Sequence, residues 1–171
     1  MGQRTGSRSR GGRTWPALLV FLALSAVVAV LGGLATTANV DGWYAAAARP
    51  SWTPPNAVFG PVWTVLYVLI AVAAWLVWRH PGHRRPALVA YGIQLALNGL
   101  WTPVFFAGYP AFGPAALWTA FGVIVVLVAA IIVQIVLTVP VSRLAAWLLV
   151  PYLLWCLYAA TLNAGVAVLN G

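Results

Sequence analysis

Long apolar stretches alternate along the chain with short segments that are richer in polar residues, glycine and proline. A helix rises about 1.5 Å per residue, so roughly 20 apolar residues cross the roughly 30 Å hydrocarbon core of a bilayer. The pattern therefore predicts an all-α membrane protein, a bundle of five transmembrane helices. The predicted spans cover residues 15–35, 58–78, 87–107, 115–137 and 144–169.

These spans form one predicted domain, residues 15–170, which follows a short basic tail, residues 1–14. The tail is rich in glycine, serine and arginine, a composition typical of disorder. In an alternative interpretation, the tail and the first span form a secretory signal peptide with a cleavage site near residues 35–38. The apolar run of the first span is longer than the usual apolar core of a signal peptide, which favours a retained helix.

Composition and charge support a membrane location. Apolar residues make up 63% of the 171 residues and charged residues only 6%, whereas roughly a quarter of the residues of a soluble domain are charged. The chain has nine arginines and one acid, Asp41. The arginines lie in the tail and the connections rather than along one stripe, so they indicate membrane topology and no binding to nucleic acid.

The number of arginines on each side of the spans predicts the orientation of the chain. Four arginines lie in the tail, three in the connection at residues 79–86 and one in the connection at residues 138–143. The opposite side carries only Arg49. Because positively charged connections stay on the cytoplasmic side, we expect the N-terminus in the cytoplasm and the C-terminus outside.

The predicted spans contain no acid, lysine or histidine, which counts against a proton- or ion-driven pump. Their polar residues are neutral, and several recur every three or four positions, so that they share a helical face. The third span places on one face Tyr91, Gln94, Asn98 and Trp101. The fifth span places on one face Tyr152, Trp155, Ala159 and Leu162, with Asn163 beside them. In the second span, Trp63 and Tyr67 lie one turn apart.

These faces have two interpretations. The amides of Gln94, Asn98 and Asn163 either form hydrogen bonds between helices, which is common in membrane bundles, or face a small-molecule pocket. Tryptophans near the span ends fit the aromatic belt at the membrane interface. Trp63, Trp101 and Trp155 lie deeper, on faces that also carry polar groups. Three such faces can converge on a cavity with aromatic walls and a few amide donors.

The first connection, residues 36–57, is unusually stiff for a loop between membrane helices. Its segment R-P-S-W-T-P-P (residues 49–55) contains three prolines, which fix their own φ angles and restrict the residues before them. The connection also carries Trp43, Tyr44 and Trp52. Such a loop is predicted to be either a packed lid over a cavity or a shelf at the lipid headgroups.

Motifs in separate parts of the chain occur in a fixed order. They read W-Y at 43–44, R-P-S-W-T-P-P at 49–55, F-G-P-V-W-T-V-L-Y at 59–67, W-L-V-W at 75–78, Q-L-A-L-N at 94–98 and P-Y-L-L-W at 151–155. Together they resemble the TspO/MBR family, which comprises the tryptophan-rich sensory proteins of bacteria and the mitochondrial translocator protein (peripheral benzodiazepine receptor). The resemblance extends over about residues 33–170.

The resemblance implies a five-helix bundle, usually a homodimer, whose cavity is covered by the first loop. Family members bind porphyrins such as protoporphyrin IX, and synthetic isoquinoline and benzodiazepine ligands. No cofactor is expected to be required, and the expected location is a bacterial cell membrane. Carried over to this chain, the ligand-lining residues are Trp43, Trp52, Trp63, Asn98, Trp101, Trp155, Ala159 and Leu162. We add Tyr67, one turn from Trp63, and Arg49, whose charge at the mouth could meet a porphyrin propionate.

The chain also departs from the family pattern. Arg49 replaces the usual lysine before Pro-Ser-Trp, which keeps the charge but changes its geometry. Arg49 could equally form an ion pair with Asp41 or contact a lipid headgroup. The acidic residue that many members carry in the fourth span is missing, and so is the sterol-recognition segment of animal members, so sterol binding is not expected.

The leading hypothesis is a tetrapyrrole-binding sensor or receptor, with a porphyrin or a similar apolar molecule and the lipid bilayer as its partners. One alternative is an enzyme that degrades porphyrin in light, for which the resemblance makes Trp63 and Trp155 the catalytic candidates. Another is a transporter of porphyrin or another apolar ligand. The spans contain no acid–base pair, nucleophile or metal site. Both histidines, His80 and His83, lie in the opposite connection, so iron ligation is not expected.

Overall fold

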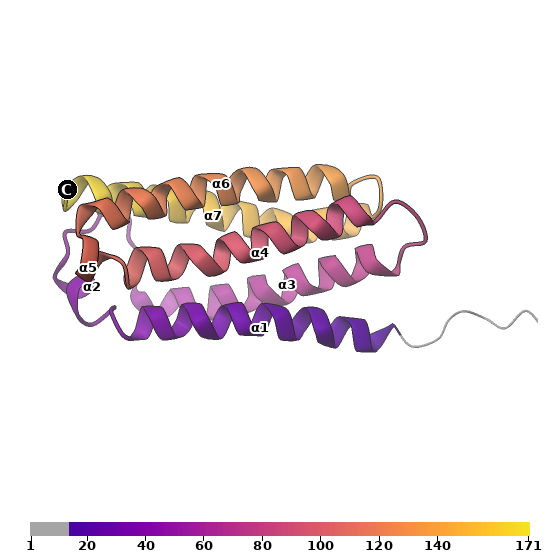
Figure 1. The fold of residues 1–171 in the computed structure, drawn as a ribbon, viewed down its shortest axis with the longest axis horizontal. Coiled ribbons are helices and arrows are strands. Elements are labelled where there is room, and N and C mark those ends of the chain that lie inside the picture. Colours follow the sequence, from indigo (N-terminus) through magenta and orange to yellow (C-terminus); the bar gives the residue numbers. More distant parts are fainter. Residues whose placement is uncertain (1–13) are drawn as a thin grey trace, which may run out of the picture.

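The computed structural model describes residues 14–171, and five long helices dominate it (Figure 1). These helices are α1 (Trp15–Thr37), α3 (Phe59–Arg79), α4 (Arg85–Phe106), α6 (Pro114–Thr138) and α7 (Arg143–Leu169). Each of the five is long and apolar enough to cross a membrane. Three short helical segments lie in the connections: α2 (Trp43–Ala46), η1 (Asn56–Val58) and α5 (Tyr109–Phe112). The prediction of an all-α bundle of five transmembrane helices is confirmed.

The ends of the long helices follow local signals in the sequence. Prolines stand in the first turn of α1, α4 and α6, where the missing amide hydrogen removes no helical hydrogen bond. Ser142 caps α7, because its Oγ accepts a hydrogen bond of 3.2 Å from the amide of Ala145. Each predicted span begins and ends within two residues of the observed helix. Except for Thr14, the predicted tail lies outside the described residues.

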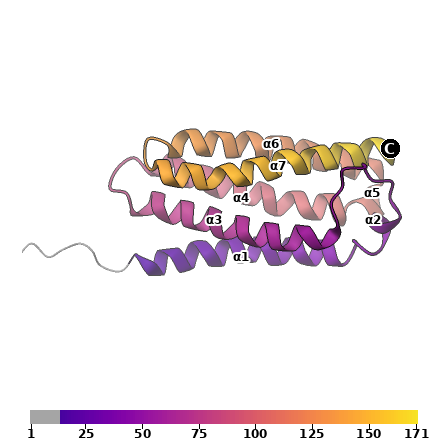
Figure 2. The same cartoon turned by 180° about the vertical axis from the view of Figure 1, so that it is seen from behind.

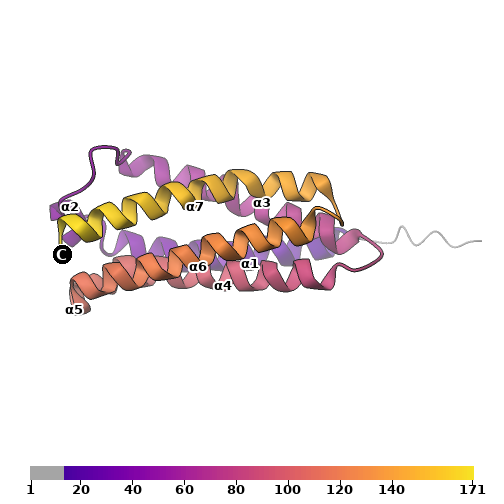
Figure 3. The ribbon, with the colours of Figure 1, turned by 90° about the horizontal axis from the view of Figure 1, so that it is seen from above.

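The five long helices form a closed ring in the order α1, α3, α7, α6, α4, and then α1 again (Figures 2 and 3). The interior of the ring is filled by side chains that are fully buried, among them Ile70, Leu117, Ile124, Leu149 and Tyr152. Helix α1 is the least buried of the five, since only Ser25 and Gly32 are buried in it. The outward faces are apolar, as they must be against hydrocarbon.

The two ends of the bundle differ in chemistry. The first loop, α5 and the C-terminus lie together at one end (Figure 1). The opposite end carries all the described arginines except Arg49, and two of them pack on tryptophans. The guanidinium carbon of Arg79 lies 4.5 Å from the ring centroid of Trp75, and that of Arg84 lies 5.4 Å from the ring centroid of Trp78. Which end faces the cytoplasm stays a prediction from the arginine count.

Candidate functional site

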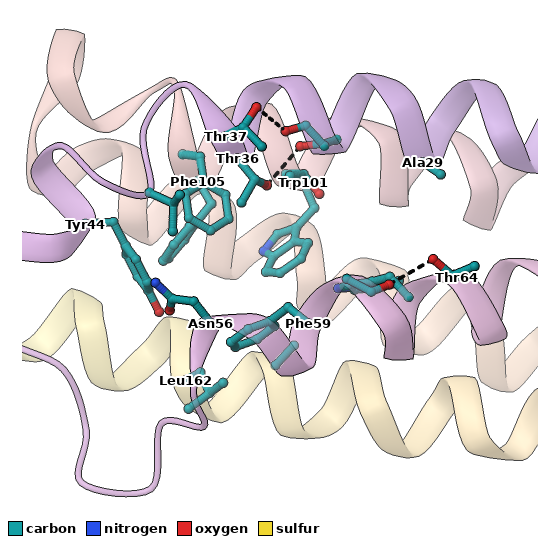
Figure 4. Close-up of a pocket in the computed structure, with 18 of the residues that line it drawn as sticks. Ala29, Thr36, Thr37, Tyr44, Asn56, Phe59, Thr64, Trp101, Phe105 and Leu162 are labelled. Atoms are coloured by element: carbon teal, nitrogen blue, oxygen red, sulfur yellow. Dashed lines mark hydrogen bonds between the residues drawn. The ribbon is translucent and has the colours of Figure 1, made fainter.

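A cavity of about 420 Å³ lies between α1, α3, α4 and α7, at the end of the bundle that carries the first loop (Figure 4). Its volume falls in the range of small-molecule sites, roughly 300–1,000 Å³. Aromatic rings supply much of its wall: Tyr44, Phe59, Trp63, Tyr67, Trp101, Phe105 and Phe106. No charged side chain of the described residues lines it. The cavity is therefore suited to a flat, apolar molecule.

Trp63 packs against three aromatic side chains, Tyr67, Trp101 and Tyr152. Its ring centroid lies 5.5 Å from that of Tyr67 and 6.3 Å from that of Trp101, with interplanar angles of 30° and 39°. The ring of Trp101 continues to Phe105 at 6.0 Å and 32°. The Trp63–Tyr67 pair is stacked, and Trp101 is tilted against both Trp63 and Phe105. The wall therefore offers ring faces against which another flat π-system can stack.

The polar edge of this wall is hydrogen-bonded within the protein. The indole N–H of Trp101 donates to Oδ1 of Asn163 at 3.0 Å, and Nδ2 of Asn163 donates to the carbonyl of Leu117 at 3.0 Å. Asn163 is 1% exposed, so it needs these partners to offset the loss of water. These two hydrogen bonds link α4, α6 and α7 through Asn163, and they therefore hold the indole plane of Trp101 in a fixed orientation.

Behind the wall, a chain of hydrogen bonds joins the middle of the bundle. The hydroxyl of Tyr67 donates to Oδ1 of Asn98 at 2.7 Å, and Nδ2 of Asn98 donates to the hydroxyl of Tyr152 at 2.9 Å. The hydroxyl of Tyr152 in turn donates to Oε1 of Gln94 at 2.8 Å. Asn98 therefore joins α3, α4 and α7. Of the four residues in this hydrogen-bonded network, only Tyr67 lines the cavity.

The second part of the first loop, residues 43–58, is packed against α7, and we call this segment the lid. The side-chain amide of Asn170 pairs with the backbone of Ala48, and the hydroxyl of Tyr158 donates to the carbonyl of Trp52 at 2.7 Å. Pro50 is buried against Gly165, where an added Cβ would lie 2.3 Å from Cγ of the proline. The loop is therefore packed on the bundle, and Tyr44 and Asn56 near its two ends line the cavity. That it covers the cavity stays a prediction.

The structure brings half of the predicted ligand-binding residues together in the cavity wall. These are Trp63, Tyr67, Trp101, Ala159 and Leu162. The remaining residues of the predicted set do not line the cavity: Trp43, Arg49, Trp52, Asn98 and Trp155. Asn98 lies one hydrogen bond behind the wall, as described above.

Trp43 and Trp155 support residues that line the cavity. The indole N–H of Trp43 donates to the carbonyl of Phe106 at 2.8 Å, and its ring stacks on Tyr109 at 4.1 Å. Trp43 thus fixes the end of α4 to the start of the lid. The ring centroid of Trp155 lies 5.9 Å from that of Phe59, and its buried Nε1 has no hydrogen-bond partner among the described residues. Both tryptophans therefore contact the cavity wall indirectly, Trp43 through Phe106 and Trp155 through Phe59.

Arg49 lies at the outer side of the lid. Its guanidinium carbon is 5.5 Å from the ring centroid of Tyr44, which lines the cavity. Burial raises the pKa of the Tyr44 phenol and the Arg49 charge lowers it by less, so the phenol is neutral at physiological pH. Arg49 also lines an outer hollow of about 660 Å³, and Asn56 lines both this hollow and the cavity. Among residues 14–171 no ion pair joins Arg49 to Asp41.

The lid tryptophan Trp52 is exposed, with 54% of its surface accessible. It contributes its backbone carbonyl to the contact with Tyr158, while its ring faces outward from the lid. This placement differs from the cavity-facing position that the resemblance implies for Trp52. Because it is exposed, the Trp52 ring can lie at the membrane surface, where amphipathic indole rings are stable.

Sequence reasoning missed the contribution of α1. Gly32, Gly33, Thr36 and Thr37 of this helix line the cavity. None of them is aromatic or strongly polar, so none marked a functional face. A signal was nevertheless present, because a Gly-x-x-x-Thr spacing occurs twice in α1 and once more at Gly60 in α3.

Fold and cavity together define an integral membrane protein that crosses the bilayer several times and contains an internal site of small-molecule size. Comparison with known proteins identifies the family. The family model of the TspO/MBR family matches residues 21–169, and the chain belongs to this family.

Similar proteins come from three distant sources. The chain is 36% identical over 157 residues to the tryptophan-rich protein TspO of Archaeoglobus fulgidus, covering 90% of this chain and 97% of that protein. It is 36% identical over 156 residues to the tryptophan-rich sensory protein of Cereibacter sphaeroides, covering 91% and 92%. It is 41% identical over 125 residues to the human translocator protein, covering 71% and 70%.

Proposed function

We propose that the protein is a porphyrin-binding sensor or receptor of the TspO type, which holds a tetrapyrrole such as protoporphyrin IX in the cavity beneath the lid. The observation that carries this proposal is the chemistry of the wall. A wall of stacked and tilted aromatic rings and the absence of charged lining residues within the described chain suit the disc of a porphyrin. The name of the relative from Cereibacter sphaeroides, a sensory protein, supports the same class.

A porphyrin is a flat, apolar disc with two carboxylates at one edge, and the site has a matching asymmetry. Trp63 and Trp101 would stack on the disc. Arg49 lies in the outer hollow, and Asn56 lies between this hollow and the cavity. A carboxylate that reaches the hollow would meet the guanidinium in a charge-assisted hydrogen bond, which is about twice as strong as a neutral one.

One observation favours the alternative of light-dependent porphyrin degradation. Trp63 lines the cavity, so its ring would be adjacent to any bound porphyrin that absorbs light. Loss of porphyrin in light but not in darkness, abolished by Trp63→Phe, would establish this activity. Trp155 is separated from the cavity by Phe59 and would affect such a reaction less.

We also propose a homodimer in a bacterial cell membrane, with the N-terminus in the cytoplasm. The orientation is supported by the arginines, since all described ones except Arg49 lie at the end opposite the lid. It places the lid on the outer side of the membrane. Reaction of an impermeant thiol reagent with Ser51→Cys in intact cells, and its failure to react with His83→Cys, would verify this orientation.

The experiment that tests porphyrin binding is a titration of protoporphyrin IX into the purified protein, followed by the quenching of tryptophan fluorescence. Trp63→Leu removes the central ring of the wall and should weaken binding about tenfold, equivalent to about 1.4 kcal/mol. Trp147→Leu is the matched control, because Trp147 is 70% exposed and lies at the other end of α7. No saturable quenching of the wild type, or equal weakening by both variants, would refute the proposal.

A further inference from the structure

The exposed lining residues of the cavity lie mainly on one side of it. Its exposed lining residues are Gly33, Thr37, Asn56, Gly60 and Thr64. All of them come from α1 or from the segment that begins with η1 and continues into α3. The lining residues of α4 and α7 are buried or half-buried. The opening therefore follows the seam between α1 and α3, and Figure 4 shows the lining side chains between these two helices.

Two glycine–threonine pairs, Gly33–Thr37 and Gly60–Thr64, give this seam small and apolar side chains, and the Gly32–Thr36 pair lies beside it. The hydroxyls of Thr36, Thr37 and Thr64 each donate to the carbonyl of the glycine four residues earlier, all at 2.9 Å. A threonine bonded in this way presents its methyl group and no free donor. Hydrocarbon does not satisfy free polar groups, so a seam lined in this manner can face lipid without cost to unpaired hydrogen-bond donors.

The glycines at the seam are not filled by neighbouring atoms. A Cβ added at Gly33 or at Gly60 would meet no other atom within 4 Å. By contrast, a Cβ at Gly32, one position away, would touch the side chain of Thr102 at 3.5 Å. Gly33 and Gly60 therefore border open space between the helices, whereas Gly32 belongs to the packed contact between α1 and α4.

The lid offers a less open route. Two hydrogen bonds to Asn170, one from Tyr158 and the packing of Pro50 on Gly165 all hold it on α7. Lifting the lid requires these contacts to break together. Helix α1, in contrast, has few buried residues to hold it in place.

We infer that ligands enter and leave the cavity from the hydrocarbon of the bilayer, through a window between α1 and α3 bordered by Gly33, Thr37, Gly60 and Thr64. The inference rests on the proposed function only for the identity of the ligand. From Ala29 to Thr37, the lining residues of α1 extend over about 12 Å of helix, at about 1.5 Å per residue. This part of α1 lies in the half of the bilayer that is nearer to the lid. The ligands admitted are accordingly apolar molecules that dissolve in the membrane.

The test uses two groups of variants of the full chain in vesicles. Gly33→Phe/Gly60→Phe narrows the window, and Gly33→Leu/Gly60→Leu narrows it less. Gly122→Phe is the matched control, since Gly122 is exposed on α6 and a Cβ there also meets nothing within 4 Å. Ala48→Cys/Asn170→Cys, joined by a bis-maleimide, fixes the lid on α7. Cys156 is fully buried and should not react.

Protoporphyrin IX, dissolved in the vesicle membrane, is followed by stopped-flow quenching of tryptophan fluorescence. A barrier on the route slows association and dissociation by the same factor and leaves Kd unchanged. We expect both rates to fall at least about tenfold in the phenylalanine pair, and less in the leucine pair. Because Gly33 and Gly60 also line the cavity, the dissociation rate is the decisive readout: a narrowed route slows dissociation, whereas lost contacts with the ligand speed it. Gly122→Phe and the fixed lid should leave both rates unchanged. Slower rates with the fixed lid but not with the narrowed window would overturn the inference, and so would a rise in Kd at unchanged association rate.

A second measurement does not depend on porphyrin binding. Leu162→Cys places a thiol in the cavity, where pyrene maleimide dissolved in the bilayer can reach it only through the window or past the lid. The phenylalanine pair should slow this labelling at least about fivefold, whereas Gly122→Phe should not. If the wild type fails to bind porphyrin but labelling still depends on the window, the proposed function is wrong and the route stands. Labelling that is insensitive to the phenylalanine pair would refute the route.

Discussion

The side-chain amide of Asn170 pairs with the backbone of Ala48, although 122 residues separate them in the sequence. The amide N–H of Ala48 donates to Oδ1 at 3.0 Å, and Nδ2 donates back to the carbonyl of Ala48 at 2.8 Å. One residue just beyond the end of α7 thus satisfies both backbone groups of a lid residue. Asn170 is thus part of the contact between the lid and α7.

Asn170→Ala should loosen the lid without unfolding the bundle. The change removes both hydrogen bonds to Ala48, and each is worth about 0.5–1.5 kcal/mol. Because the pair is exposed, the lower end of this range applies. Hydrogen exchange of the amides of residues 47–56 should become faster, while exchange in the long helices stays the same. Thr161→Ala is the control, since its exposed hydroxyl bonds only within α7. Unchanged exchange in the lid would show that the amide pair does not hold it.

Gly165→Ala should displace the lid by a different mechanism. The new methyl group would lie 2.3 Å from Cγ of Pro50, which real contacts do not allow, so the loop must move. We expect a loss of about 1–3 kcal/mol, the usual effect of overpacking, seen as a lower melting temperature in detergent.

Gly122→Ala is the control for Gly165→Ala. It lies within α6 and faces open space, so alanine there should be neutral or stabilise the helix by about 0.5–1 kcal/mol. Equal melting temperatures for the two alanine variants would contradict the contact between Pro50 and Gly165.

Asn98→Leu should destabilise the bundle more than it weakens ligand binding. The substitution leaves the buried hydroxyl of Tyr67 without its acceptor, at a cost of about 1–3 kcal/mol. It also removes the amide that donates to Tyr152, whose hydroxyl keeps its hydrogen bond to Gln94. In a Tyr67→Phe/Tyr152→Phe background the same substitution should cost less, because the groups share one network. Thermal unfolding of the variants of this cycle measures the difference. If the free-energy costs of the substitutions simply added, the network would not act as a unit.

The sequence predicts the spans well because the bilayer imposes a simple rule on length and polarity. It does not distinguish the roles of Asn98 and Asn163, although both are amides on inward faces. Packing decides between them: Asn98 lies between two tyrosines, whereas Asn163 receives the indole N–H of Trp101 at the cavity wall. The order of helices around the ring is likewise set by contacts between distant segments, so the sequence did not place α1 beside the cavity.

Arg49 should contribute to affinity only when the ligand carries carboxylates. Arg49→Gln removes the charge beside Tyr44 in the outer hollow, and we expect the Kd for protoporphyrin IX to rise about three- to tenfold, equivalent to about 0.7–1.4 kcal/mol. Arg49→Lys should lose less, because the charge remains while the planar fork is lost.

The dimethyl ester of the same porphyrin is the decisive comparison for Arg49. It keeps the disc and removes both negative charges, so Arg49→Gln should leave its Kd unchanged. The ester should also bind the wild type more weakly than the free acid does, by about the factor that Arg49→Gln costs the acid. Raising the salt concentration should reduce the difference between acid and ester, because an exposed ion pair is screened. If Arg49→Gln weakened the acid and the ester equally, the arginine would act through its packing on Tyr44 and not through a carboxylate.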